Sequence, residues 1–151
     1  MKIASPSFAA GDMVPSLHTC DGEDLSPPLK WDEPPEGTKS FALISDDSDA
    51  PGGTWVHWVI WNIPPTSRGL AQGMAKTADL ADGTRQGTTD FREIGYGGPC
   101  PPSGTHRYYF RLFALDSMLD LPAGAIRTDL DRAMHGHVLA QAELMGKYRR
   151  T

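Results

Sequence analysis

The sequence predicts a mainly β fold, either an antiparallel β sandwich or an α+β domain, with a helix near the C-terminus. Short apolar runs at residues 41–44, 56–63 and 108–115 are separated by turn signals, as expected for strands. Patterns typical of helices come only after these runs, beyond residue 127. Strands first and helices last indicate a sheet covered by a terminal helix rather than alternating βαβ units.

Proline pairs divide the chain into these runs. They lie at 27–28, 34–35, 64–65 and 101–102, and they mark loops and strand ends because proline fixes φ and lacks a backbone donor. The run at 56–63 is almost continuously apolar, which favours a strand covered on both faces. Strand alternation predicts that four of its side chains share one face: His57, Val59, Trp61 and Ile63.

Two patterns predict helix near the C-terminus. The segment Thr128-Asp129-Leu130-Asp131 resembles a capping box, with Asp where Glu is usual. From Val138 onward, apolar residues recur at helical spacing: Val138, Ala142, Met145 and Tyr148. We therefore expect the chain to end in a helix packed on the sheet.

The length and the net charge of the chain limit the classes of protein to which it can belong. A chain of 151 residues without repeats predicts one domain spanning 1–151, with a core that needs no metal or disulfide. The net charge of -5 and a pI of about 5.4 argue against a nucleic-acid binder, which usually carries a basic patch. No apolar stretch approaches the ~20 residues of a membrane helix, and no signal-peptide core is visible. We expect a cytoplasmic protein without a transmembrane segment.

Cysteine is sparse. Cys20 and Cys100 are the only two, so they cannot complete a four-ligand zinc site, and the sequence has no CxxC motif. In the cytosol the default for such a pair is two reduced thiols, with a structural or redox role left open.

Acidic residues follow the first predicted strand, and a histidine opens the second. Asp46, Asp47 and Asp49 come just after the run at 41–44. An isolated acidic turn is usually only a solvated surface, but carboxylates at a strand end can also orient a histidine or hold a cation. His57 alone is more often a structural histidine than a ligand.

A loop rich in glycine and proline, residues 95–105, leads into the third predicted strand. Glycine lets backbone N–H groups approach a ligand, although the spacing matches no nucleotide fingerprint. Period-2 alternation aligns four side chains on one face: His106, Tyr108, Phe110 and Leu112. His106 and Tyr108 can then point into one cavity. A core strand with a capping histidine is the alternative.

Taken together, these segments resemble the phosphatidylethanolamine-binding protein family, most closely the bacterial and archaeal branch often named after Raf kinase inhibitor. Asp-x-Asp-x-Pro at 47–51, Trp-x-His at 55–57 and His-Arg-Tyr at 106–108 occur in the family's order. The resemblance extends over nearly the whole chain, from Thr19-Cys20-Asp21-Gly22 and Ser26-Pro27-Pro28-Leu29 to residues 136–148. It implies a large antiparallel sheet packed on a smaller one, with helices near the C-terminus.

The resemblance also implies a pocket that binds a small anion, such as phosphate or a phosphorylated head group. Asp47 would be its acid, with Asp49 as a structural loop acceptor. The implied ligand-binding residues are Asp47, Asp49, Trp55, His57, Gly98, Pro99, His106 and Tyr108, with Ala50 and Pro51 completing the walls. Gly98 would donate its backbone N–H to the ligand. No catalytic residue, metal or cofactor is implied. A kinase or protease target and a homodimer are the implied partners.

Some positions depart from the family's pattern. Ser48 replaces a usual proline, so an ordinary trans peptide is expected there. Arg92 replaces the glycine of a usual Asp-Phe-Gly and is expected at the surface. The family pattern places Cys20 and Cys100 in loops beside the pocket, which predicts that they lie close enough to pair.

An enzyme is the alternative function. The same pocket could serve a hydrolase that depends on His and Asp, or on a metal held by Asp47, His57 and His106 with one open position. A hydrolase would also need a nucleophile or a metal, and the Gly-x-Ser-x-Gly motif is absent.

Overall fold

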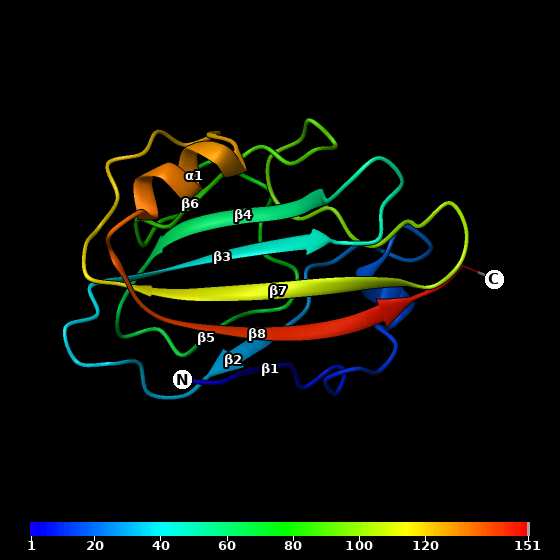
Figure 1. Ribbon diagram of the computed structural model, residues 1–151, viewed down its shortest axis with the longest axis horizontal. Coiled ribbons are helices and arrows are strands. Elements are labelled where there is room, and N and C mark those ends of the chain that lie inside the picture. Colours follow the sequence, from blue (N-terminus) through cyan, green and yellow to red (C-terminus); the bar gives the residue numbers. More distant parts are fainter. Residues whose placement is uncertain (151) are drawn as a thin grey trace.

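Two antiparallel sheets form the fold (Figure 1). The computed structural model describes residues 1–150. The five-stranded sheet has the order β6 (Arg85–Gln86), β4 (Trp55–Ile63), β3 (Ser40–Asp47), β7 (His106–Leu115) and β8 (Val138–Tyr148). The three-stranded sheet has the order β1 (Ile3–Ala4), β2 (Leu29–Trp31) and β5 (Gly69–Leu70). A 3₁₀ turn, η1 (Ser16–His18), and one α-helix, α1 (Arg127–Met134), complete the elements of the described residues. The predicted fold class is therefore confirmed.

Two apolar clusters cover the opposite faces of the large sheet. The cluster between the sheets includes Trp31, Phe41, Trp58, Phe110 and Leu112. The cluster on the other face lies under α1 and includes Ile44, Val59, Trp61, Leu130 and Met134. All residues of β3 are buried, and so are all of β4 except Trp55. The expectation that residues 56–63 are covered on both faces is confirmed.

The C-terminal segment is a strand, and the predicted terminal helix is wrong. Val138–Tyr148 pairs with β7 from Leu115↔Val138 to His106↔Tyr148. Its buried residues, Leu144, Gly146 and Tyr148, alternate with less buried ones, as strand alternation requires. The apolar residues at helical spacing share no buried face, since Val138 is exposed and Tyr148 is buried.

The one α-helix of residues 1–150 begins slightly before the predicted capping box. Its N-cap is Ile126, whose N–H donates to the Asp129 carboxylate at 3.3 Å. Asp129 therefore performs the acidic half of a capping box, and Thr128 is inside the helix. No helix among these residues is long and apolar enough to cross a membrane.

Irregularities in β4 break its predicted alternation. Ser45 pairs with Trp58 but Asp46 pairs with Val56, so His57 is an extra residue between them. A second irregularity lies near Asn62, which has a positive φ of 55°. The prediction that His57, Val59, Trp61 and Ile63 share a face is therefore wrong. Val59 and Trp61 pack under α1, Ile63 packs between the sheets, and His57 turns towards Tyr108.

The pairing of β3 with β7 brings the predicted site residues to one end of the large sheet. Asp47 lies opposite Tyr108, and Asp46 lies opposite Tyr109. His106 begins β7 at the same end. Because the side chains of neighbouring strand residues point to opposite faces, the carboxylates of Asp46 and Asp47 lie on different faces of the sheet.

A disulfide joins two loops at this end. Cys20 and Cys100 are bonded, with their Cα atoms 5.4 Å apart, inside the ~7 Å limit. The predicted proximity is confirmed, and the expectation of two reduced thiols is wrong for this structure. The bond ties the loop after η1 to the glycine- and proline-rich loop, and Cys20 N–H also donates to the Pro99 carbonyl at 3.1 Å.

Trp61→Ala should lower the free energy of unfolding by about 3–5 kcal/mol, because the side chain is fully buried under α1. Urea unfolding monitored by circular dichroism measures the change. Trp55→Ala is the matched control, since Trp55 is 38% exposed and its loss should cost much less. Equal effects of the two variants would contradict the core assignment.

Reduction of the disulfide should lower the free energy of unfolding by roughly 2–4 kcal/mol, because the bond joins residues 80 apart and restricts the unfolded chain. Thermal unfolding with and without reductant measures this. The double variant Cys20→Ser/Cys100→Ser should not respond to reductant. Unchanged unfolding of the native protein after both thiols have been shown to be free would contradict the prediction.

Candidate functional site

A cavity of about 270 Å³ lies where β3 ends and β4 and β7 begin. Its lining consists of Asp47, Ala50, Pro51, Trp55, His57, Phe91, Cys100, Pro101, Pro102, His106 and Tyr108. Most of these residues are apolar or aromatic. The polar side chains in the lining are one carboxylate, two imidazoles and one phenol, all of them buried.

His106 and Asp47 form a buried pair. The His106 Nδ1 donates to Asp47 Oδ2 at 2.6 Å. The other carboxylate oxygen, Oδ1, accepts the Asp49 N–H at 2.8 Å. The Asp47 carboxylate is therefore held from two sides, and it fixes the proton of the His106 ring on Nδ1. The Nε2 of His106 is left to interact within the cavity.

His57 is anchored by the backbone instead. Its Nδ1 donates to the Gly97 carbonyl at 2.6 Å, and the Gly97 N–H donates back to the His57 carbonyl at 2.9 Å. The ring packs edge-on against Tyr108 and Phe91, with centroids 5.3 and 5.1 Å away. Burial lowers the pKa of His57, and the Gly97 bond and the Asp47 charge oppose this only in part. His57 is therefore neutral at pH 7, with Nε2 unprotonated.

The Tyr108 hydroxyl is buried and has no partner in good hydrogen-bond geometry among the described residues, although the Asp47 carboxylate lies close enough to act on its pKa through a weak hydrogen bond. The residue is 1% exposed, and burial together with the nearby Asp47 charge raises the pKa of Tyr108. The hydroxyl is therefore protonated and can donate. An unpaired buried hydroxyl costs free energy, so a group that accepts its hydrogen bond would be stabilised in this cavity.

Two aromatic side chains form the mouth of the cavity. Trp55 and Phe91 are each 38% exposed, and their rings pack edge to face with centroids 5.6 Å apart. Large exposed aromatic rings beside a polar cavity are typical of a site that contacts the rest of a ligand.

The other two acids of the segment hold the structure together. Asp49 accepts bonds from the Arg107 side chain at 2.8 and 2.9 Å and from its N–H, which holds the pKa of Asp49 down to about 2. Asp46 lies on the opposite face of the sheet, where Arg111 and Arg127 bond to its buried carboxylate. Neither residue lines the cavity.

A family model described as phosphatidylethanolamine-binding protein matches residues 4–149. This chain belongs to that family. It is 53% identical over 150 residues to a UPF0098 protein of Methanothermobacter thermautotrophicus, covering 99% of each chain. It is 49% identical over 153 residues to one of Aquifex aeolicus, covering 99% of this chain and 89% of the relative.

Solved structures of this family have the same fold. A crystal structure described as a phosphatidylethanolamine-binding protein homolog from Chlamydia trachomatis is 38% identical, with a TM-score of 0.91 and coverage of 99% of this chain and 97% of the other. E. coli YbcL, described as a new member of the mammalian family, is 33% identical, with a TM-score of 0.91 and coverage of 99% and 98%.

The cavity brings together most of the residues that the family resemblance implied. Asp47, Trp55, His57, His106 and Tyr108 line it, together with the two implied wall residues, Ala50 and Pro51. Asp49, Gly98 and Pro99 lie outside the lining. Asp49 is a loop acceptor, as the resemblance implied.

Gly98 was expected to donate its backbone N–H to a ligand, but that N–H donates to Asp24 Oδ1 at 2.8 Å. A Cβ on Gly98 would lie 2.1 Å from the His18 carbonyl oxygen and 2.4 Å from Asp24 Oδ1. Glycine is therefore required here because the backbone approaches His18 and Asp24 closely.

Four lining residues were missed by sequence reasoning: Phe91, Cys100, Pro101 and Pro102. The last three belong to the loop that was expected near the pocket. Phe91 precedes Arg92, whose φ is 64°, a conformation that glycine adopts at little cost. This positive φ explains why the family usually has glycine at this position. Arg92 itself is exposed and lies outside the lining, as expected. No peptide bond of residues 1–150 is cis, in agreement with the expectation for Ser48.

The described residues contain no group of three His, Cys, Asp or Glu side chains that could hold a metal ion. In particular, Asp47, His57 and His106 do not form the three-ligand site considered above. Both Asp47 oxygens already accept hydrogen bonds, and the Nδ1 atoms of the two histidines are engaged.

The free energy of unfolding should fall as the pH drops below about 6.5, the usual histidine pKa. Burial lowers the pKa of both His18 and His57 in the folded state, so the unfolded chain binds more protons in this range. The stabilisation is present above the unfolded pKa and is lost as the pH falls towards the folded values. Urea unfolding at pH 7.5, 6.5 and 5.5 measures it.

The variant His57→Gln should show a smaller loss over the same pH range, because one of the two buried rings is gone. A native protein that becomes more stable as the pH falls from 7.5 to 5.5 would contradict this account.

Proposed function

We propose that the cavity binds a small anion, phosphate or a phosphorylated head group, and that the protein is a ligand-binding module rather than an enzyme. The observation that carries this proposal is the meeting of two anchored imidazoles and an unpartnered buried hydroxyl in one cavity. The nucleic-acid and metal classes lack comparable support, since the net charge is -5 and the described residues form no metal cluster.

Each polar group of the cavity has a role in this proposal. Since the Nδ1 of each histidine is engaged, its Nε2 can carry a second proton and donate to an anion. Asp47 accepts the Nδ1 proton of His106 and so orients that ring, and the Tyr108 hydroxyl can donate a third bond to the anion. The apolar walls lower the local dielectric and strengthen each of these bonds.

The charges of the lining make binding dependent on protons. With both histidines neutral, the lining carries only the negative charge of Asp47. A doubly charged anion therefore binds best when the rings are protonated. We therefore expect the site to bind a protonated anion, which can supply the protons itself, or a fully charged anion at mildly acidic pH.

Partners and location complete the proposal at the level of the family. A kinase or protease is the proposed target class, with the pocket and its surrounding loops as the contact surface, and a homodimer is the proposed assembly. Light scattering at micromolar concentration tests the assembly. The proposed location is the cytoplasm, a compartment in which a lasting disulfide such as Cys20–Cys100 is rare outside hyperthermophiles.

The alternative hydrolase would have general acid–base groups in His57, His106 and Asp47, but the lining offers it no hydroxyl of serine or threonine and no free thiol as a nucleophile. The one cysteine of the lining, Cys100, is in the disulfide. A screen with phosphate monoesters and carboxylic esters separates the two functions.

Sulfate affinity should be highest near pH 5 and should weaken towards about pH 8, because sulfate stays doubly charged while the histidines lose their protons. Isothermal titration calorimetry across this range measures the effect. His106→Ala should remove most of the binding, and Asp47→Asn should weaken it less, since Asp47 acts through His106.

His137→Ala is the matched control. His137 also donates from Nδ1 to a carboxylate, Asp116, at 2.8 Å, but it is exposed and lies outside the cavity. This variant should bind sulfate as the native protein does. A native affinity that is flat from pH 5 to 8, or a His106→Ala variant that binds normally, would overturn the anion-pocket proposal.

A further inference from the structure

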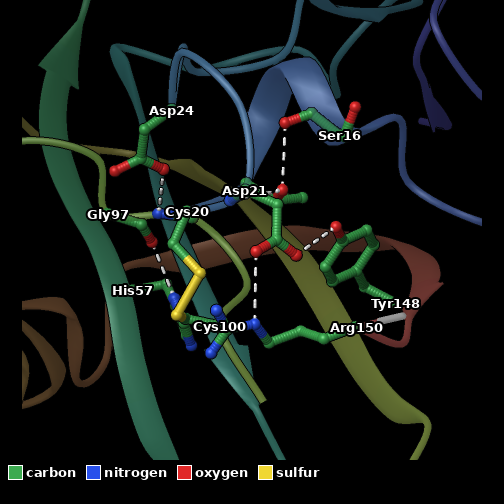
Figure 2. The surroundings of a disulfide bond; sticks show 11 residues. Ser16, Cys20, Asp21, Asp24, His57, Gly97, Cys100, Tyr148 and Arg150 are labelled. Carbon is green, nitrogen blue, oxygen red and sulfur yellow. Dashed lines mark hydrogen bonds and ion pairs between the residues drawn. A yellow bond between two sulfur atoms is a disulfide. The ribbon is translucent and has the colours of Figure 1, made fainter. Parts of the chain in front are cut away.

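A second carboxylate, that of Asp24, lies close to the anchor of His57, in the lining of a neighbouring pocket of about 290 Å³. Asp24 is in the loop that follows η1, and it does not line the cavity with His57. Figure 2 shows Asp24 and His57 on opposite sides of Gly97, beside the disulfide. Sequence reasoning gave Asp24 no role.

One peptide unit joins Asp24 to His57. The Gly98 N–H donates to Asp24 Oδ1 at 2.8 Å, and the Gly97 carbonyl of the same peptide unit accepts from His57 Nδ1 at 2.6 Å. Hydrogen bonds in a chain polarise one another. A carboxylate on the N–H side makes the carbonyl oxygen more negative, and that oxygen becomes a stronger acceptor for His57.

We propose that Asp24 is a positioning residue for His57, acting through the Gly97–Gly98 peptide. It keeps the His57 proton on Nδ1, leaves Nε2 to the cavity, and stabilises the charged ring when an anion binds. Asp24 thus does for His57 through one peptide what Asp47 does for His106 directly.

The local backbone is held in the geometry that this arrangement needs. Asp24 has a positive φ of 59°, an uncommon conformation for a residue other than glycine. A side chain on Gly98 would collide with Asp24 Oδ1. The disulfide and the bond from Cys20 N–H to the Pro99 carbonyl hold the two loops together on either side of this contact. Strain that the surroundings maintain at one residue is typical of functional positions.

Other charges also act on His57. The ionisable groups around it are Asp46 and Asp47 on β3, and His106 and Tyr108 on β7. Lys76 Nζ lies 3.7 Å from Asp24 Oδ2 and weakens the field of that carboxylate. Burial lowers the pKa of His57 overall, and the Asp24 charge opposes this effect.

Nuclear magnetic resonance of the histidine ring nitrogens, without any added anion, tests the proposal. Asp24→Asn keeps an oxygen acceptor for the Gly98 N–H but removes the charge, so it should lower the pKa of His57 and leave the fold unchanged. Asp24→Ala should also reduce the share of the Nδ1–H form. Lys76→Gln should shift the pKa of His57 in the opposite direction, because it leaves the Asp24 charge unscreened.

Asp21→Asn is the matched control. Asp21 lies in the same loop, but its carboxylate accepts from Tyr148 and Arg150 (Figure 2). This variant should leave the titration of His57 as it is in the native protein. If Asp24→Asn folds and His57 titrates as in the native protein, the proposal is overturned. If Asp24→Asn does not fold, Lys76→Gln decides: an unchanged or lowered pKa of His57 overturns the proposal.

A second experiment rests on the proposed anion site. At pH 6, Asp24→Asn should bind sulfate about 3- to 10-fold more weakly than the native protein, while Asp21→Asn should bind as the native protein does. If the native protein does not bind sulfate, the anion-pocket proposal fails, and the titration of His57 without anion still decides the role of Asp24. If the native protein binds sulfate but His57 titrates in Asp24→Asn as it does in the native protein, only the proposed role of Asp24 is overturned.

Discussion

The pocket depends on the register between β3 and β7. That register sets Asp47 opposite Tyr108 and brings the carboxylate within 2.6 Å of His106. It also sends Asp46 to the other face, where two arginines compensate its buried charge. A slip of one residue would turn every side chain of β3 to the other face, so Asp47 would leave His106, Asp46 would leave its arginines, and the apolar residues would leave their clusters. Burial on both faces of β3 makes such a slip costly.

At this end of the sheet, the strands fix only one of the two cavity histidines, and a loop fixes the other. His106 is fixed by a side chain of a neighbouring strand, whereas His57 is fixed by the backbone of the glycine- and proline-rich loop. That loop is in turn bound to η1 and the segment after it by a disulfide, by the Gly98–Asp24 bond and by the bond from the Tyr96 hydroxyl to the His18 carbonyl. The two imidazole rings therefore line the same cavity, but each is held in place by a different part of the structure. Preorganised donors of this kind bind a ligand without a large cost of ordering side chains.

Much of this arrangement could be predicted from the sequence, because it follows from local alternation or from motifs. The shared face of His106, Tyr108, Phe110 and Leu112 needs only a regular strand. The faces of β4 could not be predicted in this way, because its irregularities arise from pairing with β3. Val138–Tyr148 was misread because apolar residues at helical spacing also fit an edge strand with a half-exposed face. The hydrogen-bond acceptor of the Gly98 N–H, Asp24, is 74 residues away in the chain, so no local sequence pattern could predict this bond.

The central claim is that His57, His106 and Tyr108 together hold one anion, and anomalous diffraction locates such an anion directly. Crystals soaked in selenate, an analogue of sulfate, at mildly acidic pH should show one strong selenium peak in the cavity. That peak should lie within hydrogen-bonding distance of both Nε2 atoms and of the Tyr108 hydroxyl. A peak only at surface arginines or lysines, with the cavity holding water, would contradict the claim.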